Sequence, residues 1–260
     1  MKKISYVSTA LVLMLSLLAC NNTENAEKSN TSKDVSEVMP SNDVNETPVR
    51  SILTAEEQAD MTPDEIIGRL KKGNENFASN NLTRRDHSAQ RRQAMIGQYP
   101  KAIVLSCVDS RVPVEDVFDL GIGDIFVARV AGNIENADIV GSMEFATAVA
   151  GSKLVIVMGH SSCGAVKHAV DNTDAASMEM NALQNLLEEI KPSLEGVEPN
   201  GEVSSKNIEF LDKVISNNAV QTVKDIRKQS PKMAALEDEG KIKIVAAVYD
   251  MESGKVKFMN

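Results

Sequence analysis

Aromatic residues are few in this sequence, and runs of basic residues are missing altogether. Aromatic side chains make up 3% of the 260 residues, and the formal net charge is −9. Nucleic-acid-binding proteins cluster lysine and arginine and often stack bases on aromatic rings, so we predict no nucleic-acid partner. The contents of apolar residues (42%) and charged residues (25%) are ordinary for a globular protein. The length predicts one domain of ordinary size or two small ones, with a well-filled core.

The apolar run at the amino terminus is too short for a spanning helix, which needs about 20 residues. It follows two lysines and ends in "LLAC", which resembles the bacterial lipobox, where the chain is cut before a cysteine that carries lipid. We therefore expect residues 1–19 to be a lipoprotein signal peptide and Cys20 to be lipidated. The protein would then be exported and held at the cell envelope by this anchor alone. The alternatives are an uncleaved anchor and ordinary cleavage after Ala19, which usually requires a small residue where Leu17 stands.

The next stretch has few residues that could bury a core. Residues 20–54 are rich in asparagine, serine, threonine and glutamate, a composition typical of disorder. We predict a flexible polar tether here, of the kind that a lipid-anchored domain needs to clear the membrane. The folded domain is expected over residues 55–260.

Short apolar runs rich in β-branched residues predict the strands of the folded part. Runs that are apolar throughout are typical of parallel strands covered on both faces, and the last run should pair back as an antiparallel arm. The predicted strands cover residues 101–106, 124–130, 153–159, 241–250 and 255–259. Helical patterns cover residues 62–80, 87–98, 137–151, 165–170, 177–192, 207–220 and 221–231. The fold class is α/β: a mostly parallel central sheet of four to five strands flanked by helices, with an N-terminal helical arm.

Cysteine and histidine are scarce, with three of each, yet three of these six residues stand near the ends of predicted strands. Cys107 follows the first strand and His160 the third, so both lie at the carboxyl edge of the sheet, where such folds bind ligands. Cys163 stands three residues after His160, just before a helix that begins at Gly164 and favours a thiolate at its amino end. Two thiolates and one imidazole predict zinc, and three protein ligands are typical of a catalytic site with an open fourth position.

The remaining histidines are weaker candidates for metal binding. His87 lies in a predicted surface helix, and His168 stands on a different helical face from Cys163, so we expect neither to be a ligand. Asp109 could bind the metal or lie beside it, held by Arg111 in a bidentate pair. Since two thiolates cancel the charge of Zn²⁺, a carboxylate in this place would help to orient the reacting water.

Two motifs carry a family resemblance. "CVDSRV" at residues 107–112 and "GHSSCG" at residues 159–164 resemble the β-class carbonic anhydrases, and the likeness extends over about residues 60–260. The resemblance implies zinc-dependent, reversible hydration of CO₂ to bicarbonate and a proton. It also implies a parallel sheet with an antiparallel arm, and assembly as a homodimer or a multiple of dimers with active sites near the subunit interface.

The same resemblance assigns residues to the catalytic centre. It implies that Cys107, His160 and Cys163 bind one Zn²⁺ per chain. It makes Asp109 and Arg111 a catalytic dyad, in which the aspartate of some members swings to displace the water.

The substrate pocket is implied in the same way. Gln98 falls where the family has a glutamine that hydrogen-bonds substrate, and Phe126 and Ala131 fall at apolar pocket positions. Gly164, beside the metal ligands, is included among the substrate-binding residues. Phe145 stands where many members carry a tyrosine, and this departure leaves one wall of the pocket open to question.

Two other functions fit parts of the pattern. A non-enzymatic exported protein could join Cys107 to Cys163 in a disulfide, because extracytoplasmic compartments oxidise thiols. A zinc hydrolase of carbonyl sulfide or carbon disulfide could use the same site. In the hydration of CO₂, His87 or His168 could help to carry the released proton away from the site, although a lone surface histidine is more often only solvated.

Overall fold

Four parallel strands and one antiparallel strand form the sheet of this protein, whose computed structural model describes residues 52–259. The strands are β1 (Ala102–Ser106), β2 (Ile125–Arg129), β3 (Leu154–His160), β4 (Lys243–Tyr249) and β5 (Val256–Phe258). They are ordered β2-β1-β3-β4-β5, and only β5 runs antiparallel to its neighbour. The predicted fold class and all five predicted strands are confirmed. The predicted signal peptide and nearly all of the predicted tether lie outside the described residues.

Helices precede, connect and follow the strands. The α-helices of residues 52–259 are α1 (Ala55–Asp60), α2 (Pro63–Ala78), α3 (His87–Ala94), α4 (Val114–Val117), α5 (Ala137–Glu144), α6 (Gly164–Val170), α7 (Asn181–Ile190), α8 (Ile208–Gln229) and α9 (Pro231–Asp238). A π-helical turn, Phe145–Val149, continues α5, and short 3₁₀ turns cover Ala131–Asn133, Ala176–Met178 and Lys191–Leu194. Within this part of the chain, none of the helices has the length and apolar character needed to cross a bilayer.

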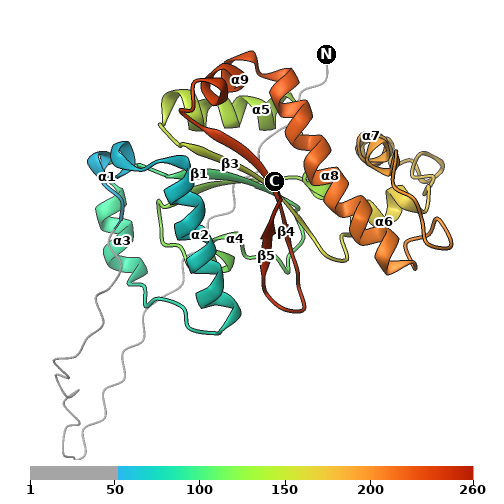
Figure 1. Ribbon diagram of the computed structural model, residues 1–260, viewed down its shortest axis with the longest axis horizontal. Coiled ribbons are helices and arrows are strands. Elements are labelled where there is room, and N and C mark those ends of the chain that lie inside the picture. The colour runs from blue at the N-terminus through green and yellow to red at the C-terminus, as the bar shows by residue number, and fades with distance from the viewer. Residues whose placement is uncertain (1–51, 260) are drawn as a thin grey trace, which may run out of the picture. The chain divides into compact units, whose positions relative to one another are not determined.

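The helices cover both faces of the sheet (Figure 1). On one face, Leu70 of α2 and Phe118 after α4 pack in a cluster with Ile156 of β3. On the other face, α5, α8 and α9 form a second cluster, in which Val223 of α8 belongs with Val157 of β3. Every residue of β1 and β3 is buried, as expected for strands covered on both faces. The edge strand β2 is only half-buried.

A third apolar cluster lies beyond the carboxyl ends of the strands. Helices α6 and α7 and the first half of α8 contribute its aliphatic side chains, such as Val166, Leu187 and Leu211. Cys107 and Cys163 belong to the same cluster. The functional edge of the sheet therefore has a packed apolar wall of its own.

Several predicted helix boundaries were wrong. The two helices predicted at 207–220 and 221–231 form the single helix α8, because no glycine or proline interrupts the sequence before Pro231. The helix predicted from residue 177 begins only at Asn181, since Glu179 adopts a left-handed conformation with φ of 60°. Helix α3 ends at Ala94, short of the predicted residue 98. Helices α1, α4 and α9 were not predicted.

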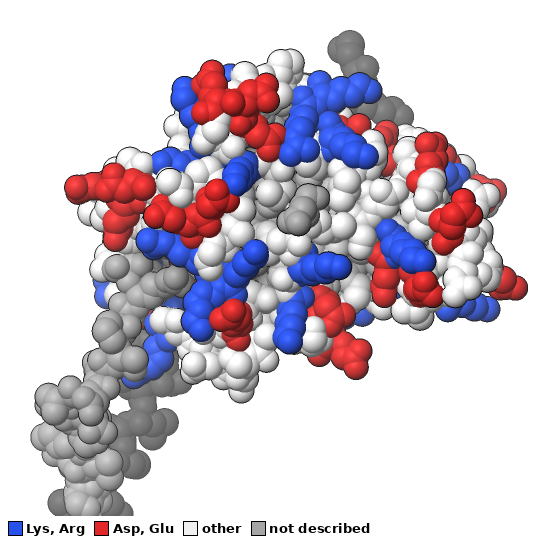
Figure 2. All heavy atoms as spheres, in the orientation of Figure 1, with Lys and Arg blue, Asp and Glu red and all other residues white. Residues whose placement is uncertain are grey.

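The amino half of β4 extends beyond β5 and is covered by an ion pair. Arg227 of α8 donates to the carbonyl of Ile244 at 2.9 Å, and Glu237 of α9 accepts from the N–H of Ile244 at 2.9 Å. Arg227 and Glu237 are themselves paired at 2.7 Å. Cationic and anionic side chains are interspersed over this face of the molecule (Figure 2), where Lys243 of β4 also pairs with Asp64 of α2.

Helix α2 lies very close to the backbone that follows α4. A β-carbon added at Gly73 would lie 2.0 Å from the carbonyl oxygen of Phe118, so only glycine fits there. The next residue, Asn74, is buried and donates to the carbonyls of Val117 at 3.0 Å and Gly254 at 2.8 Å. These contacts fix α2 against the face of the sheet.

We expect Gly73→Ala to lower the free energy of unfolding by about 1–3 kcal/mol, because the methyl group meets backbone that cannot yield cheaply. Gly68→Ala in the same helix is the matched control: a β-carbon there meets nothing within 4 Å. The control should raise the free energy of unfolding by up to about 1 kcal/mol, through helix propensity alone. Chemical denaturation of both variants tests the close approach, and equal stabilities would contradict it.

Candidate metal centre and active site

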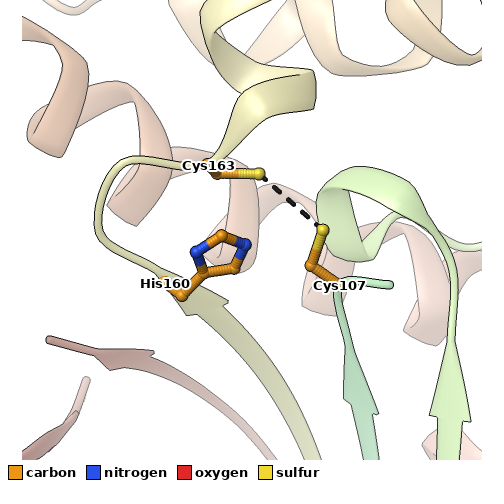
Figure 3. Close-up of side chains that lie close together, drawn as sticks. All are labelled: Cys107, His160 and Cys163. Carbon is orange, nitrogen blue, oxygen red and sulfur yellow. Dashed lines mark hydrogen bonds between the residues drawn. The ribbon is translucent and has the colours of Figure 1, made fainter. Parts of the chain in front are cut away.

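Neighbouring parallel strands bring Cys107 and His160 to one edge of the sheet. Cys107 is the first residue after β1, as predicted. His160 was predicted to follow β3, but it is the last residue of that strand. A tight turn, with Ser162 at φ of 57°, returns the chain so that Cys163 stands immediately before α6. The three side chains converge from two loops (Figure 3).

The three predicted ligands form a compact buried cluster. Their donor atoms all lie within 4.8 Å of one another, and the sulfurs of Cys107 and Cys163 are 3.9 Å apart. A disulfide requires about 2.05 Å between sulfurs, so both cysteines are free thiols and the disulfide hypothesis was wrong. Two thiolates about 2.3 Å from a tetrahedral zinc ion would be separated by about 3.8 Å. The spacing of the sulfurs therefore fits zinc.

His160 is oriented as a ligand by its neighbour. Its Nδ1 atom lies 3.0 Å from the carbonyl oxygen of Ser161, a contact that requires a proton on Nδ1. The lone pair of a neutral ring is then on Nε2, which is buried and has no hydrogen-bond partner among the described residues. A buried polar atom without a partner is costly unless another group binds it, and a metal ion would do so.

The two thiols share one hydrogen bond, and their acidities diverge because of it. Cys163 donates to Cys107, which lowers the pKa of the Cys107 thiol to about 4 against the opposing effect of burial. The same bond and the same burial raise the pKa of Cys163. The protein alone thus stabilises one thiolate of the pair, whereas a divalent cation between the sulfurs would stabilise both. The donor set, its spacing and its charge all fit zinc.

Asp109 is held beside the cluster by Arg111, as the sequence predicted. Arg111 donates from Nε to Oδ1 at 2.9 Å and from Nη2 to Oδ2 at 2.7 Å, and its backbone N–H bonds Oδ1 at 3.0 Å. These hydrogen bonds hold the pKa of the Asp109 carboxyl well below its usual range. Asp109 Oδ2 lies 3.8 Å from His160 Nε2, so an ionised carboxylate faces the cluster. In this conformation both of its oxygens are engaged by Arg111.

Sequence analysis missed a second set of contacts, which hold Cys107. The backbone N–H of Gly132 lies 3.4 Å from the Cys107 sulfur and donates to it, and the carbonyl of Gly132 accepts from Asn218 Nδ2 at 2.7 Å. Asn218 is buried in the largely apolar stripe of α8, which also contains Thr222. An asparagine among residues such as Ile215 and Ala219 was the one signal in the sequence for this contact.

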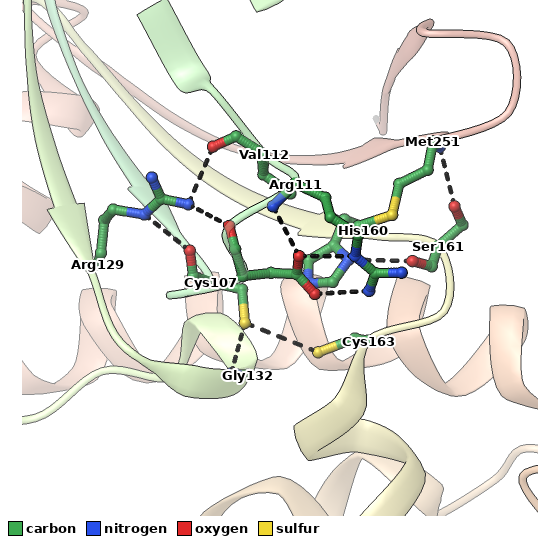
Figure 4. Close-up of polar contacts among 10 residues, drawn as sticks. Cys107, Arg111, Val112, Arg129, Gly132, His160, Ser161, Cys163 and Met251 are labelled. Atoms are coloured by element: carbon green, nitrogen blue, oxygen red, sulfur yellow. Dashed lines mark hydrogen bonds and ion pairs between the residues drawn. The ribbon is translucent and has the colours of Figure 1, made fainter.

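Arg129, at the end of β2, was also missed. Its side chain crosses to the loop between β1 and α4, where it donates to three backbone carbonyls (Figure 4). It is the exposed last residue of β2, and sequence analysis gave it no role.

The structure does not bring every predicted pocket residue to the metal cluster. Gln98 is exposed and stands four residues before β1, whereas Cys107 follows its carboxyl end. A strand of five residues spans about 17 Å, so Gln98 lies toward the opposite edge of the sheet from the cluster of its own chain. Ala131 and Gly164 are near the cluster in sequence: Ala131 precedes Gly132, and Gly164 follows Cys163.

Phe126 and Phe145 face one another away from the cluster. Their rings meet edge to face with centroids 6.1 Å apart. They line a cavity of about 650 Å³ between β2 and α5, together with Ile103, Ala128 and Ile139. Asp138 and Ser142 also line this cavity, so its wall is mixed rather than wholly apolar.

The other two histidines lie outside the cluster, as predicted. His87 is the exposed first residue of α3. His168 is exposed on α6, and its Nδ1 lies 3.0 Å from the hydroxyl of Thr173. Neither shares the set of mutually close donor atoms.

Comparison with known proteins finds one family. Residues 102–256 match the family model described as carbonic anhydrase. Carbonic anhydrase 2 of Mycobacterium tuberculosis is 30% identical over 187 residues, which cover 72% of this chain and 87% of that protein. The carbonic anhydrase of Mycolicibacterium smegmatis is 31% identical over 189 residues, which cover 72% and 89%.

Solved structures share the fold. The β-carbonic anhydrase CcaA superimposes with a TM-score of 0.60 and 24% identity, over 76% of this chain and 94% of that chain. One of two tetrameric β-carbonic anhydrases of Sordaria macrospora gives a TM-score of 0.52 and 20% identity, over 65% and 85%.

The sulfur geometry predicts that no disulfide forms at the cluster. Alkylation of the denatured full-length protein without reductant should label both Cys107 and Cys163, because their sulfurs are too far apart to be bonded. Peptide mapping by mass spectrometry reads the result. A cross-linked peptide pair containing these two cysteines would contradict the geometry.

Proposed function

This chain belongs to the carbonic anhydrase family, as a β-class enzyme that reversibly hydrates CO₂ to bicarbonate and a proton, and we propose that Cys107, His160 and Cys163 hold its zinc ion. The observation that carries the assignment is the buried cluster of two sulfurs and an unpartnered imidazole nitrogen. When bound, zinc lowers the pKa of water and so supplies a nucleophile near neutral pH, a role for which carbonic anhydrase is the standard example. The match to carbonic anhydrases over most of their length favours CO₂ over carbonyl sulfide or carbon disulfide as substrate.

Three protein ligands support a catalytic rather than a structural ion. Structural zinc sites close with four protein ligands, whereas catalytic sites keep one position for water or substrate. Within residues 52–259, the three side chains are the only such group of metal-binding residues. We propose one zinc ion per chain on this basis.

Asp109 and Arg111 are proposed as the catalytic pair. An ionised carboxylate only accepts hydrogen bonds, so Asp109 can accept one from the attacking water and leave a lone pair directed at the carbon of CO₂. Arg111 keeps the carboxylate ionised and fixes its orientation through two parallel hydrogen bonds. Because Arg111 lowers the pKa of Asp109, the pair stays ionised as the pH falls from neutral toward the ordinary range of aspartate.

Substrate contacts from a second subunit would complete the site. Gln98 lies at the wrong end of β1 to reach its own cluster, so we propose that it serves the cluster of a partner in a homodimer or a multiple of dimers. The neighbouring Met95 and Ile96 are 86% and 89% exposed, which is unusual for apolar side chains and supports an interface there. Phe126 and Ala131 are proposed to line the apolar part of the pocket, and Gly164 to leave room beside Cys163.

We also propose that the enzyme works at the bacterial cell envelope as a lipoprotein. The support is the sequence: the short apolar run that ends at Cys20 and the polar stretch that separates it from the folded domain. CO₂ crosses membranes without a carrier, so its hydration at this location needs no import of substrate.

Asp109→Asn should keep its zinc yet lose most of its CO₂ hydration activity, because an amide is neutral and can donate a hydrogen bond where a carboxylate only accepts one. Stopped-flow hydration assays and metal analysis give the two readouts. Asp116→Asn is a matched control, since Asp116 also pairs with an arginine, Arg85, at 2.6 Å but away from the cluster.

Cys163→Ala should lose the zinc itself, and the same metal analysis measures this loss.

An Asp109→Asn enzyme with unchanged turnover would remove Asp109 from the mechanism. A Cys163→Ala protein that retains a full equivalent of zinc would remove that residue from the ligand set. Wild-type protein with one zinc per chain but no hydration of CO₂ would overturn the proposed use of the centre and direct attention to the sulfur-containing analogues.

The envelope proposal has a separate test. Cys20→Ala should abolish lipidation and release the protein from the membrane fraction, because the thiol that accepts the lipid is gone. Fractionation of bacterial cells with immunodetection measures this. Continued association of Cys20→Ala with membranes would contradict the lipoprotein interpretation.

A further inference from the structure

One arginine binds three carbonyls of the loop that carries the active-site residues. Arg129 donates from Nε to the carbonyl of Cys107 at 2.9 Å, and from Nη2 to the carbonyls of Asp109 at 2.7 Å and Val112 at 2.9 Å. These acceptors are the backbone oxygens of a proposed zinc ligand, of the proposed catalytic carboxylate and of the residue that closes the loop. Arg129 comes from β2, so it ties this loop to a strand outside it (Figure 4).

Burial alone does not fix this loop. Cys107 and Val112 at its ends are buried, but Val108 is 57% exposed, and Ser110 and Arg111 are exposed as well. The loop follows the last residue of β1, so its backbone groups have left the sheet ladder. Its conformation therefore depends on polar contacts, and Arg129 supplies three of them.

The chemistry of the side chain suits this task better than any other cation would. A guanidinium presents five N–H donors in a rigid plane, whereas an ammonium group offers a single nitrogen. Within residues 52–259, Arg129 forms no ion pair, so its hydrogen bonds go to the loop and to no carboxylate. Arg111, in contrast, is committed to the side chain of Asp109.

We propose that Arg129 is a positioning residue of the active site: it sets the backbone of the loop so that the Cys107 sulfur and the Asp109 carboxylate stay directed at the metal centre. Its side-chain hydrogen bonds all go to backbone carbonyls, so it is assigned neither as a ligand nor as a catalytic residue, and its role rests on the ligand and catalytic roles proposed above. The carbonyl of Cys107 and its sulfur belong to the same residue, so loss of the hydrogen bond at the carbonyl frees the ligand to rotate. Asp109 is released in the same step.

The test compares Arg129→Lys and Arg129→Ala with wild type in the zinc-loaded, full-length protein. Zinc affinity is measured by competition with a chelator of known affinity, and kcat and KM for CO₂ by stopped flow. Both variants should lose zinc affinity by about 10- to 100-fold, as is typical when a residue that orients a ligand is removed. We expect kcat to fall by at least about 10-fold and KM to change by less than about 3-fold, because the loss concerns orientation rather than the binding of CO₂.

Chemical rescue separates positioning from general stability. Methylguanidinium at millimolar concentration should restore part of the zinc affinity and kcat of Arg129→Ala, since it can replace the missing donors. Arg227→Ala and Arg227→Lys are the matched controls. Arg227 of α8 also donates to a backbone carbonyl, but to that of Ile244 in the amino half of β4. These controls should keep wild-type zinc affinity and kcat, and methylguanidinium should leave them unchanged.

Wild-type zinc affinity and kcat in Arg129→Lys or Arg129→Ala would overturn the proposal. Equal losses in the Arg227 variants, or losses that methylguanidinium does not reduce, would assign the effect to stability. If Arg129→Ala does not fold, Arg129→Lys decides on zinc affinity and the split between kcat and KM. A wild-type protein that fails to hydrate CO₂ would overturn the proposed function alone, because the zinc competition still tests the positioning of Cys107.

Discussion

The parallel pairing of β1 with β3 is the constraint on which the active site depends. It directs the ends of two strands to the same edge, so that residues 53 positions apart in the sequence become neighbours: Cys107 after β1 and His160 at the end of β3. The third donor, Cys163, needs only a short turn to join them. β1 and β3 are buried along their whole length, so their carboxyl ends are held by the packed core. The side chains of Cys107 and His160 are therefore built on rigid backbone.

Around this edge, every polar group of the site is oriented by a neighbour. The carbonyl of Ser161 selects the nitrogen of His160 that faces the sulfurs, and the N–H of Gly132 donates to Cys107. Arg111 holds Asp109 ionised, while Asn218 fixes Gly132 from the far side. Such a shell fixes the directions of the buried thiols, the imidazole and the carboxylate around the proposed metal site.

The sequence was sufficient to predict that Cys107, His160 and Cys163 lie together and that Arg111 holds Asp109 beside them, but not to find the groups that orient them. Cys107 and His160 could be placed because each stands next to a strongly apolar run, and strands of that kind are the elements that sequence patterns identify best. The contact of Asn218 with Gly132 joins residues 86 positions apart, and the sequence signals only that a polar side chain stands in a mostly apolar stripe, not which group it contacts. The three acceptors of Arg129 are backbone oxygens, which carry no sequence signal at all. Gln98 shows another limit, since the family resemblance gives this residue a role but not its position relative to the cluster.

The two outermost strands of the sheet, β5 and β2, form its lateral edges, and these edges differ in how freely they could pair with another copy of the chain. At one edge, β5 has only three residues, and the side chains of Arg227 and Glu237 occupy the hydrogen-bonding groups of Ile244 that a further strand would use. At the other edge, β2 presents four half-buried residues and one exposed residue, with no strand beyond them among those described. Growth of a sheet by edge-to-edge pairing needs two receptive edges on each copy, whereas a sheet with one receptive edge can pair only with the same edge of a second copy, about a two-fold axis. Pairing through β2 would therefore end at a dimer and would not continue into a polymer.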